Sequence, residues 1–204
     1  DQSWLDTYGM VQTIMADFPE FLPNTYDQYY LYPDYKVSHL DPNFTRADEV
    51  MAGREKRVFT ECAEVIKEGK LGDKFHAISD AHAEMMIKVA EAIAYNKNDR
   101  HILIVENNGA IANMQDDAMV EVVCELGING PRPMRVGNIP QFNLGLLVNQ
   151  VSCEKLIVDA YFENSYQKAL EAFTLNRLIN DAKKARKVLD ALIEANKGMW
   201  PELR

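Results

Sequence analysis

Strand-type alternation of apolar and polar side chains is confined to one short part of this chain. From residue 119 to 126, Val120 and Val122 fall on one side of an extended backbone, whereas Glu121 and Glu125 fall on the other. One apolar face and one acidic face predict a half-buried strand in an antiparallel sheet. Too few such segments alternate with helices to build a doubly wound parallel sheet.

The rest of the chain is dominated by helical spacing. The β-branched residues 101–106 predict a second strand, the Asn-Asn-Gly at 107–109 predicts a turn, and 133–136 predicts a third, shorter strand. Apolar residues three and four apart predict long helices. These helices are expected over residues 3–16, 45–69, 80–96, 142–174 and 180–196. The expected fold class is α+β, with long helices packed on a small antiparallel sheet.

Arg46 lies in the first turn of the helix expected over 45–69, where Thr45 and Asp48 have the spacing of a capping box. A cation is unfavourable at a helix N-terminus, because the helix dipole is positive there. An anion bound by both the guanidinium and the free backbone N–H groups would relieve this conflict. The alternative is a surface arginine paired with Asp48 or Glu49.

Five of the nine tyrosines are concentrated between residues 26 and 35. One interpretation is an aromatic lid or interface loop. The other is that one phenol faces a substrate as a base. A free phenol has a pKa near ~10, so a tyrosine base needs a nearby cation or metal to act near neutral pH.

Composition excludes several classes of function. The 31 acidic against 22 basic residues give a net charge of -9, which disfavours binding to nucleic acid. No apolar stretch approaches the ~18 residues of a membrane span. Cys62, Cys124 and Cys153 lack metal-ligand spacing and indicate reduced thiols in a cytosolic protein. Asp80 and His82 could hold a metal or shuttle a proton, although they more often cap a helix.

Several long motifs are similar to one known family. They are LPNTYDQYYL at 22–31, TRADEVM at 45–51, IVENNGAIAN at 104–113, IPQF at 139–142, and EANK with WPEL within 194–203. The chain resembles the C-terminal half of the family 4 glycoside hydrolases along nearly its whole length, and most closely their 6-phospho-α-glucosidases. The resemblance therefore implies that residues 1–204 form a C-terminal substrate and catalytic domain, and that an N-terminal Rossmann domain is absent from this chain.

The resemblance implies a fold like the C-terminal domain of lactate and malate dehydrogenases. It also implies NAD and Mn²⁺ as cofactors, bound mainly by the missing half, so no metal ligand is expected here. Tyr26 matches the family's catalytic base, and Arg46 matches its substrate-binding arginine, the partner of the sugar 6-phosphate. Neither assignment follows from spacing alone.

The implied activity is the hydrolysis of phosphorylated α-glucosides to glucose 6-phosphate, in a cytoplasmic homo-oligomer. NAD oxidises carbon 3, a tyrosine removes the proton on carbon 2, the aglycone is eliminated, and water adds. Within the family, a 6-phospho-β-glucosidase or an α-galactosidase remains an alternative. So does a dehydrogenase domain of similar fold, or a module serving mainly oligomerisation. The fragment alone is expected to be inactive.

Overall fold

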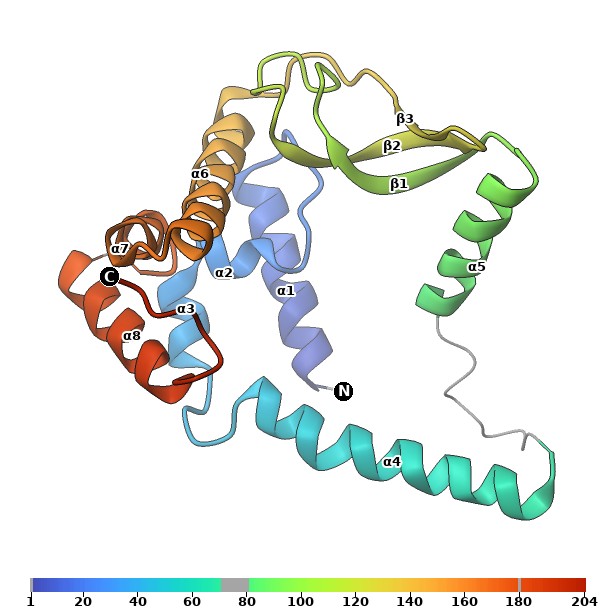
Figure 1. Ribbon diagram of the computed structural model, residues 1–204, viewed down its shortest axis with the longest axis horizontal. Helices are drawn as coiled ribbons and strands as arrows, with labels where there is room; N and C mark the ends of the chain where they lie inside the picture. Colours follow the sequence, from blue (N-terminus) through green and yellow to red (C-terminus); the bar gives the residue numbers. More distant parts are fainter. Residues whose placement is uncertain (1, 71–80, 180) are drawn as a thin grey trace.

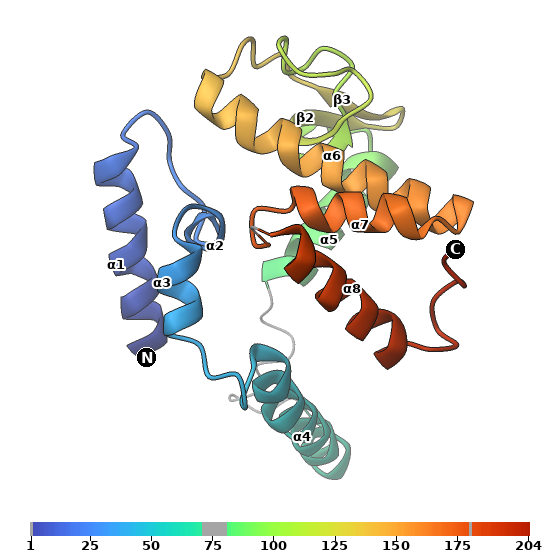
Figure 2. The same ribbon diagram turned by 90° about the vertical axis from the view of Figure 1, so that its left-hand side faces the viewer.

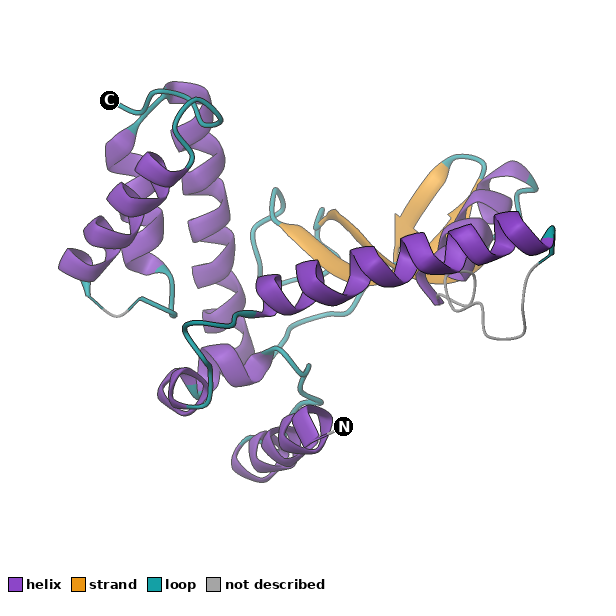
Figure 3. Cartoon of the chain, turned by 90° about the horizontal axis from the view of Figure 1, so that it is seen from below, coloured by secondary structure: helices purple, strands orange, loops and turns teal. Residues whose placement is uncertain are grey.

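A computed structural model of the chain describes residues 2–70, 81–179 and 181–204, except for the side chains of residues 2–4. The elements follow the predicted order, with helices before and after a single small sheet (Figures 1 and 3). They are α1 Gln2–Asp17, α2 Asp27–Leu31, α3 Pro33–Ser38, α4 Arg46–Glu68, α5 Ala81–Ala94, β1 Asp99–Glu106, β2 Met119–Gly127, β3 Gly130–Pro133, α6 Gln141–Glu163, α7 Tyr166–Leu175 and α8 Ala182–Ala195. The α+β class is confirmed.

The sheet has the order β1-β2-β3 and is antiparallel throughout. Val122 of β2 lies opposite Leu103 of β1. The alternate residues on the inner face of β2 are buried, whereas Glu121 on the other face is exposed; the buried ones are Val120, Val122, Cys124 and Leu126. The predicted alternation is therefore confirmed. The third strand was predicted at 133–136, but it occupies 130–133. Its two prolines are tolerated because β3 pairs with β2 alone and so lies at the edge of the sheet. The N–H groups that proline lacks are therefore not needed for hydrogen bonds to a further strand.

The loop between β1 and β2 is organised around one buried asparagine. Asn107 is fully buried, and its side-chain oxygen accepts a hydrogen bond from the N–H of Ile111 at 2.7 Å. Its amide donates to the carbonyls of Ile111, Met114 and Gln115 at 3.0–3.1 Å. The turn predicted here is confirmed at Asn108 and Gly109, which have positive φ. The loop that follows packs its apolar side chains on the sheet.

Helix α6 contributes to both hydrophobic clusters. Val151 packs in the cluster formed by the inner face of β2 and the loop after β1. Ala160 packs in a second cluster with α7 and α8, which includes Leu189. Figures 1 and 2 show α6 extending from the sheet toward these two helices.

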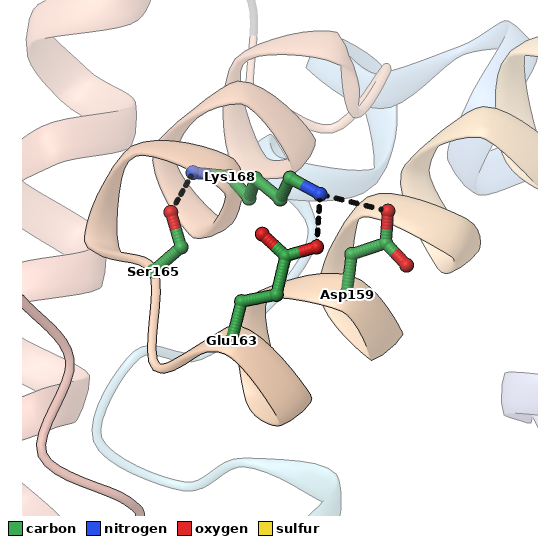
Figure 4. Close-up of polar contacts among 4 residues, drawn as sticks. All are labelled: Asp159, Glu163, Ser165 and Lys168. Carbon is green, nitrogen blue, oxygen red and sulfur yellow. Dashed lines mark hydrogen bonds and ion pairs between the residues drawn. The ribbon is translucent and has the colours of Figure 1, made fainter.

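The prediction of one helix over 142–174 was wrong. The chain turns at Asn164, which adopts a left-handed conformation with φ 54° and ends α6. Ser165 then caps α7 by accepting a hydrogen bond from the N–H of Lys168. The Lys168 ammonium binds the carboxylates of Asp159 and Glu163 at 3.1 and 2.6 Å, which ties α7 back onto α6 (Figure 4). Asparagine and serine are favourable at these two positions, so the break has a local cause.

The aromatic segment also differs from its prediction as a loop. It forms the two short helices α2 and α3, with Pro33 at the first position of α3. Proline is favourable there because the first helical N–H needs no intrahelical partner. No helix in the described residues is both long and apolar enough to cross a membrane.

Candidate active site

Tyr26 lies at the N-terminus of α2, and its side chain is 68% exposed. Its backbone is fixed by neighbouring side chains. Asn24 accepts a hydrogen bond from the Tyr26 N–H at 2.9 Å, and Asp27 accepts one from the Asn24 N–H at 2.7 Å. These local bonds form a turn before the helix, as Asn and Asp favour. They place an exposed phenol on a well-defined backbone.

Gln28 is the residue that sequence reasoning missed at this site. It is buried, and its amide donates to the carbonyl of Thr25 at 2.6 Å. Its side-chain oxygen has no hydrogen-bond partner among the described residues. The one sequence signal for its burial is its position between Tyr26 and Tyr29, within the aromatic segment. Gln28 helps to hold the backbone just before Tyr26.

The other four tyrosines of the cluster make contacts within the fold. Tyr32 donates a hydrogen bond to Asp17, which raises the pKa of Tyr32 to about 12 and makes it a poor base. The ring of Tyr29 stacks on that of Tyr26, with centroids 6.2 Å apart. The ring of Tyr35 packs against a histidine, and the backbone carbonyl of Tyr30 accepts a hydrogen bond from an arginine.

The start of α4 confirms the predicted cap. Thr45 accepts a hydrogen bond from the Asp48 N–H, and the Asp48 carboxylate accepts from the Thr45 N–H at 2.8 Å. The Thr45 bonds lower the pKa of Asp48. The Arg46 guanidinium binds Glu49 at 2.5 Å. The structure thus shows the surface pair that was the alternative interpretation, with Glu49 as the partner.

The pKa of Arg46 is raised first by its hydrogen bond to Glu49 and then by the charge of that carboxylate, and loss of hydration partly offsets this rise. Tyr26 and Tyr29 would raise it further only in their ionised forms. A neutral phenol carries no charge, so the ion pair with Glu49 dominates the electrostatics of Arg46 near neutral pH.

The remaining candidates from the sequence are the three cysteines and the pair Asp80 and His82. Burial raises the pKa of the thiols of Cys124 and Cys153, whereas Cys62 is exposed. His82 lies in the first turn of α5, while Asp80 lies outside the described residues. In the described ranges, no group of three or more His, Cys, Asp or Glu side chains could hold a metal.

Comparison with known proteins decides the family. Residues 1–179 match the C-terminal domain of the family 4 glycosyl hydrolases. The chain belongs to this family. Maltose-6'-phosphate glucosidase MalH of Clostridium acetobutylicum is 50% identical over the whole chain, which covers 46% of that relative. A probable 6-phospho-β-glucosidase of Bacillus subtilis is 30% identical over 90% of the chain, which covers 44% of that protein.

Two crystal structures of family 4 enzymes share the fold over the whole chain, which covers 46% of each. A 6-phospho-α-glucosidase from gut microorganisms, in complex with NAD and Mn²⁺, is 81% identical with a TM-score of 0.93. Another such enzyme, in complex with NAD and glucose 6-phosphate, is 46% identical with the same TM-score. The family 4 chain described here therefore spans about half the length of these relatives.

Proposed function

We propose that this chain is the C-terminal half of an NAD- and Mn²⁺-dependent 6-phospho-α-glucosidase that hydrolyses phosphorylated α-glucosides such as maltose 6'-phosphate. The observation that carries the proposal is a difference in sequence identity. The chain is 50% identical to a maltose-6'-phosphate glucosidase but 30% identical to a probable 6-phospho-β-glucosidase. Turnover of nitrophenyl 6-phospho-α- and β-glucosides by the full-length enzyme tests it, and preference for the β-anomer would contradict it.

The chain itself would supply two groups to this reaction. The Tyr26 phenol would remove the proton on carbon 2 of the sugar, and the Arg46 guanidinium would bind the 6-phosphate. Both groups are accessible to a ligand, because Tyr26 is 68% exposed and the Arg46 side chain is 73% exposed. The bound NAD would supply the hydride chemistry and Mn²⁺ would supply positive charge, both held mainly by the half of the enzyme that this chain does not match. The described residues offer no metal cluster of their own.

Arg46→Ala in the full-length enzyme should raise KM for phosphorylated substrates by about ten- to a hundredfold. A charge-assisted hydrogen bond contributes roughly 1.5–3 kcal/mol, which corresponds to that range. Arg46→Lys should rescue binding only in part, because lysine lacks the bidentate fork. Steady-state kinetics with matched phosphorylated substrates measures both effects.

Glu49→Gln is the matched control for Arg46. It removes the carboxylate that binds the guanidinium at 2.5 Å, so Arg46 becomes free to bind phosphate. KM should therefore fall or stay constant in this variant. An unchanged KM in Arg46→Ala, or a similar rise in KM in both variants, would assign Arg46 to a surface ion pair alone.

The isolated chain should be catalytically inactive and should bind NAD negligibly. The reason is that its described residues hold no metal cluster, and its sequence contains no glycine-rich dinucleotide loop. Calorimetry with NAD and a phosphoglucosidase assay with Mn²⁺ test this, after circular dichroism has shown that the chain is folded. A rate comparable to that of the full-length enzyme would contradict the proposal that NAD and Mn²⁺ are held mainly by the other half of the enzyme.

A further inference from the structure

The side chain of Tyr26 is held differently from its backbone. Tyr26 is the N-cap of α2, where its side chain makes no capping hydrogen bond, and most of the residue is exposed. Within the described part of the chain, its one aromatic neighbour is Tyr29, with ring centroids 6.2 Å apart and ring planes 28° apart. This distance is typical of an attractive aromatic pair. The ring of Tyr29 therefore limits the directions in which the Tyr26 phenol can point.

Tyr29 is itself held by a cation from the next helix. The ammonium of Lys36, in α3, lies over the Tyr29 ring at 5.1 Å from its centroid. A cation is attracted to the face of an aromatic ring within ~6 Å of the centroid, and more strongly where it is partly desolvated. Lys36 is half-buried, and α3 contacts α2 (Figures 1 and 2). Lys36 thus fixes the ring that stacks on Tyr26.

We propose that Tyr29 and Lys36 are positioning residues for Tyr26: the ammonium fixes the ring of Tyr29, and that ring orients the Tyr26 phenol toward the substrate. This inference rests on the proposed role of Tyr26 as the base. A base must come within ~2.6–3.2 Å of the atom whose proton it removes. A misplacement of ~1 Å can cost about a hundredfold in rate. Loss of the supporting ring would therefore slow the proton transfer.

Two substitutions of Tyr29 in the full-length enzyme separate the effect of the ring from that of the hydroxyl. Tyr29→Phe keeps the ring that makes both contacts, so kcat should stay close to that of the parent. Tyr29→Leu removes the ring and should lower kcat about two- to tenfold, in keeping with the strength of an aromatic pair. The loss should fall on kcat more than on KM, because orientation of the base acts on the proton transfer. Steady-state kinetics measures both constants, and circular dichroism checks the fold.

Lys36→Met tests the second contact, because methionine keeps an unbranched side chain and removes the charge. Its kcat should fall about two- to fivefold, the effect of losing one cation from a ring face. Lys36→Arg should restore most of this loss, since a guanidinium also lies favourably over an aromatic ring. Arg186→Met is the matched control. It removes the guanidinium that lies 5.7 Å from the ring centroid of Tyr166, between α8 and α7, and should leave kcat unchanged.

A substrate deuterated at carbon 2 shows which step has slowed. In Tyr29→Leu and Lys36→Met, the isotope effect on kcat should equal or exceed that of the parent, because proton transfer limits turnover more strongly. An isotope effect that falls toward one would overturn the proposal. So would equal kcat in Tyr29→Leu and Tyr29→Phe, or in Lys36→Met and Lys36→Arg.

Tyr26→Phe, measured in parallel, separates this proposal from the assignment of the base. Near-normal kcat in Tyr26→Phe would overturn both. A large loss in Tyr26→Phe beside normal kcat in Tyr29→Leu would overturn the positioning role alone and leave Tyr26 as the base.

Discussion

Replacing Tyr26 with phenylalanine in the full-length enzyme should lower kcat by about 10²–10⁴-fold, the usual effect of removing a general base. The substitution keeps the ring that stacks on Tyr29 and removes only the hydroxyl, so the fold should be unaffected. The loss should fall on kcat more than on KM, because the proton transfer is made in the transition state. Steady-state kinetics with maltose 6'-phosphate measures it.

Tyr32→Phe is the matched control in the same cluster. Its hydroxyl is already committed to Asp17, so its removal should cost much less activity. A substrate deuterated at carbon 2 gives an independent readout, since its isotope effect should change in Tyr26→Phe and not in Tyr32→Phe. Near-normal kcat in Tyr26→Phe, or a larger loss at another tyrosine of the cluster, would remove Tyr26 from this role.

Asn107→Leu should lower the free energy of unfolding by about 3–5 kcal/mol, the largest stability effect expected of a single substitution here. Leucine has a similar volume but cannot make the four hydrogen bonds of the Asn107 side chain to Ile111, Met114 and Gln115. Each buried backbone group that loses its partner costs about 1–3 kcal/mol, and local relaxation limits the sum. Urea unfolding, followed by circular dichroism, measures the change.

Asn108→Gly provides the comparison at the next position. Asn108 is exposed, its side-chain amide donates a hydrogen bond to Glu106 at the end of β1, and it has a positive φ that glycine adopts freely. Its substitution should cost less than about 1 kcal/mol. Equal destabilisation by the two variants would show that the buried network contributes little to stability.

The sequence predicted those elements that are determined by residues close to one another in the chain. The bonds between Thr45 and Asp48 define the start of α4, and the alternation around Val120 defines β2. The break at Asn164 also had a local signal, which the apolar spacing on both sides obscured. The position of β3 had no local signal in the sequence. Prolines in a strand are acceptable only at an edge of the sheet, and which strand lies at the edge depends on the whole sheet.

The candidate site was predicted less completely than the fold. Tyr26 and Arg46 were selected by resemblance, and their roles remain proposals. The pairing of Arg46 with Glu49 rather than Asp48 follows from the cap, which uses the Asp48 carboxylate. The burial of Gln28 depends on tertiary packing that no periodicity in the sequence records.

The position of α6 in both hydrophobic clusters has a consequence for how the domain unfolds. Val151 belongs to the sheet cluster and Ala160 belongs to the cluster with α7 and α8, so unfolding of α6 would remove a buried side chain from both clusters. We therefore expect the sheet and the C-terminal helices to unfold as one cooperative unit, with similar protection of their buried amide protons from exchange. A substitution that destabilises the sheet cluster should therefore also lower the protection of α7 and α8.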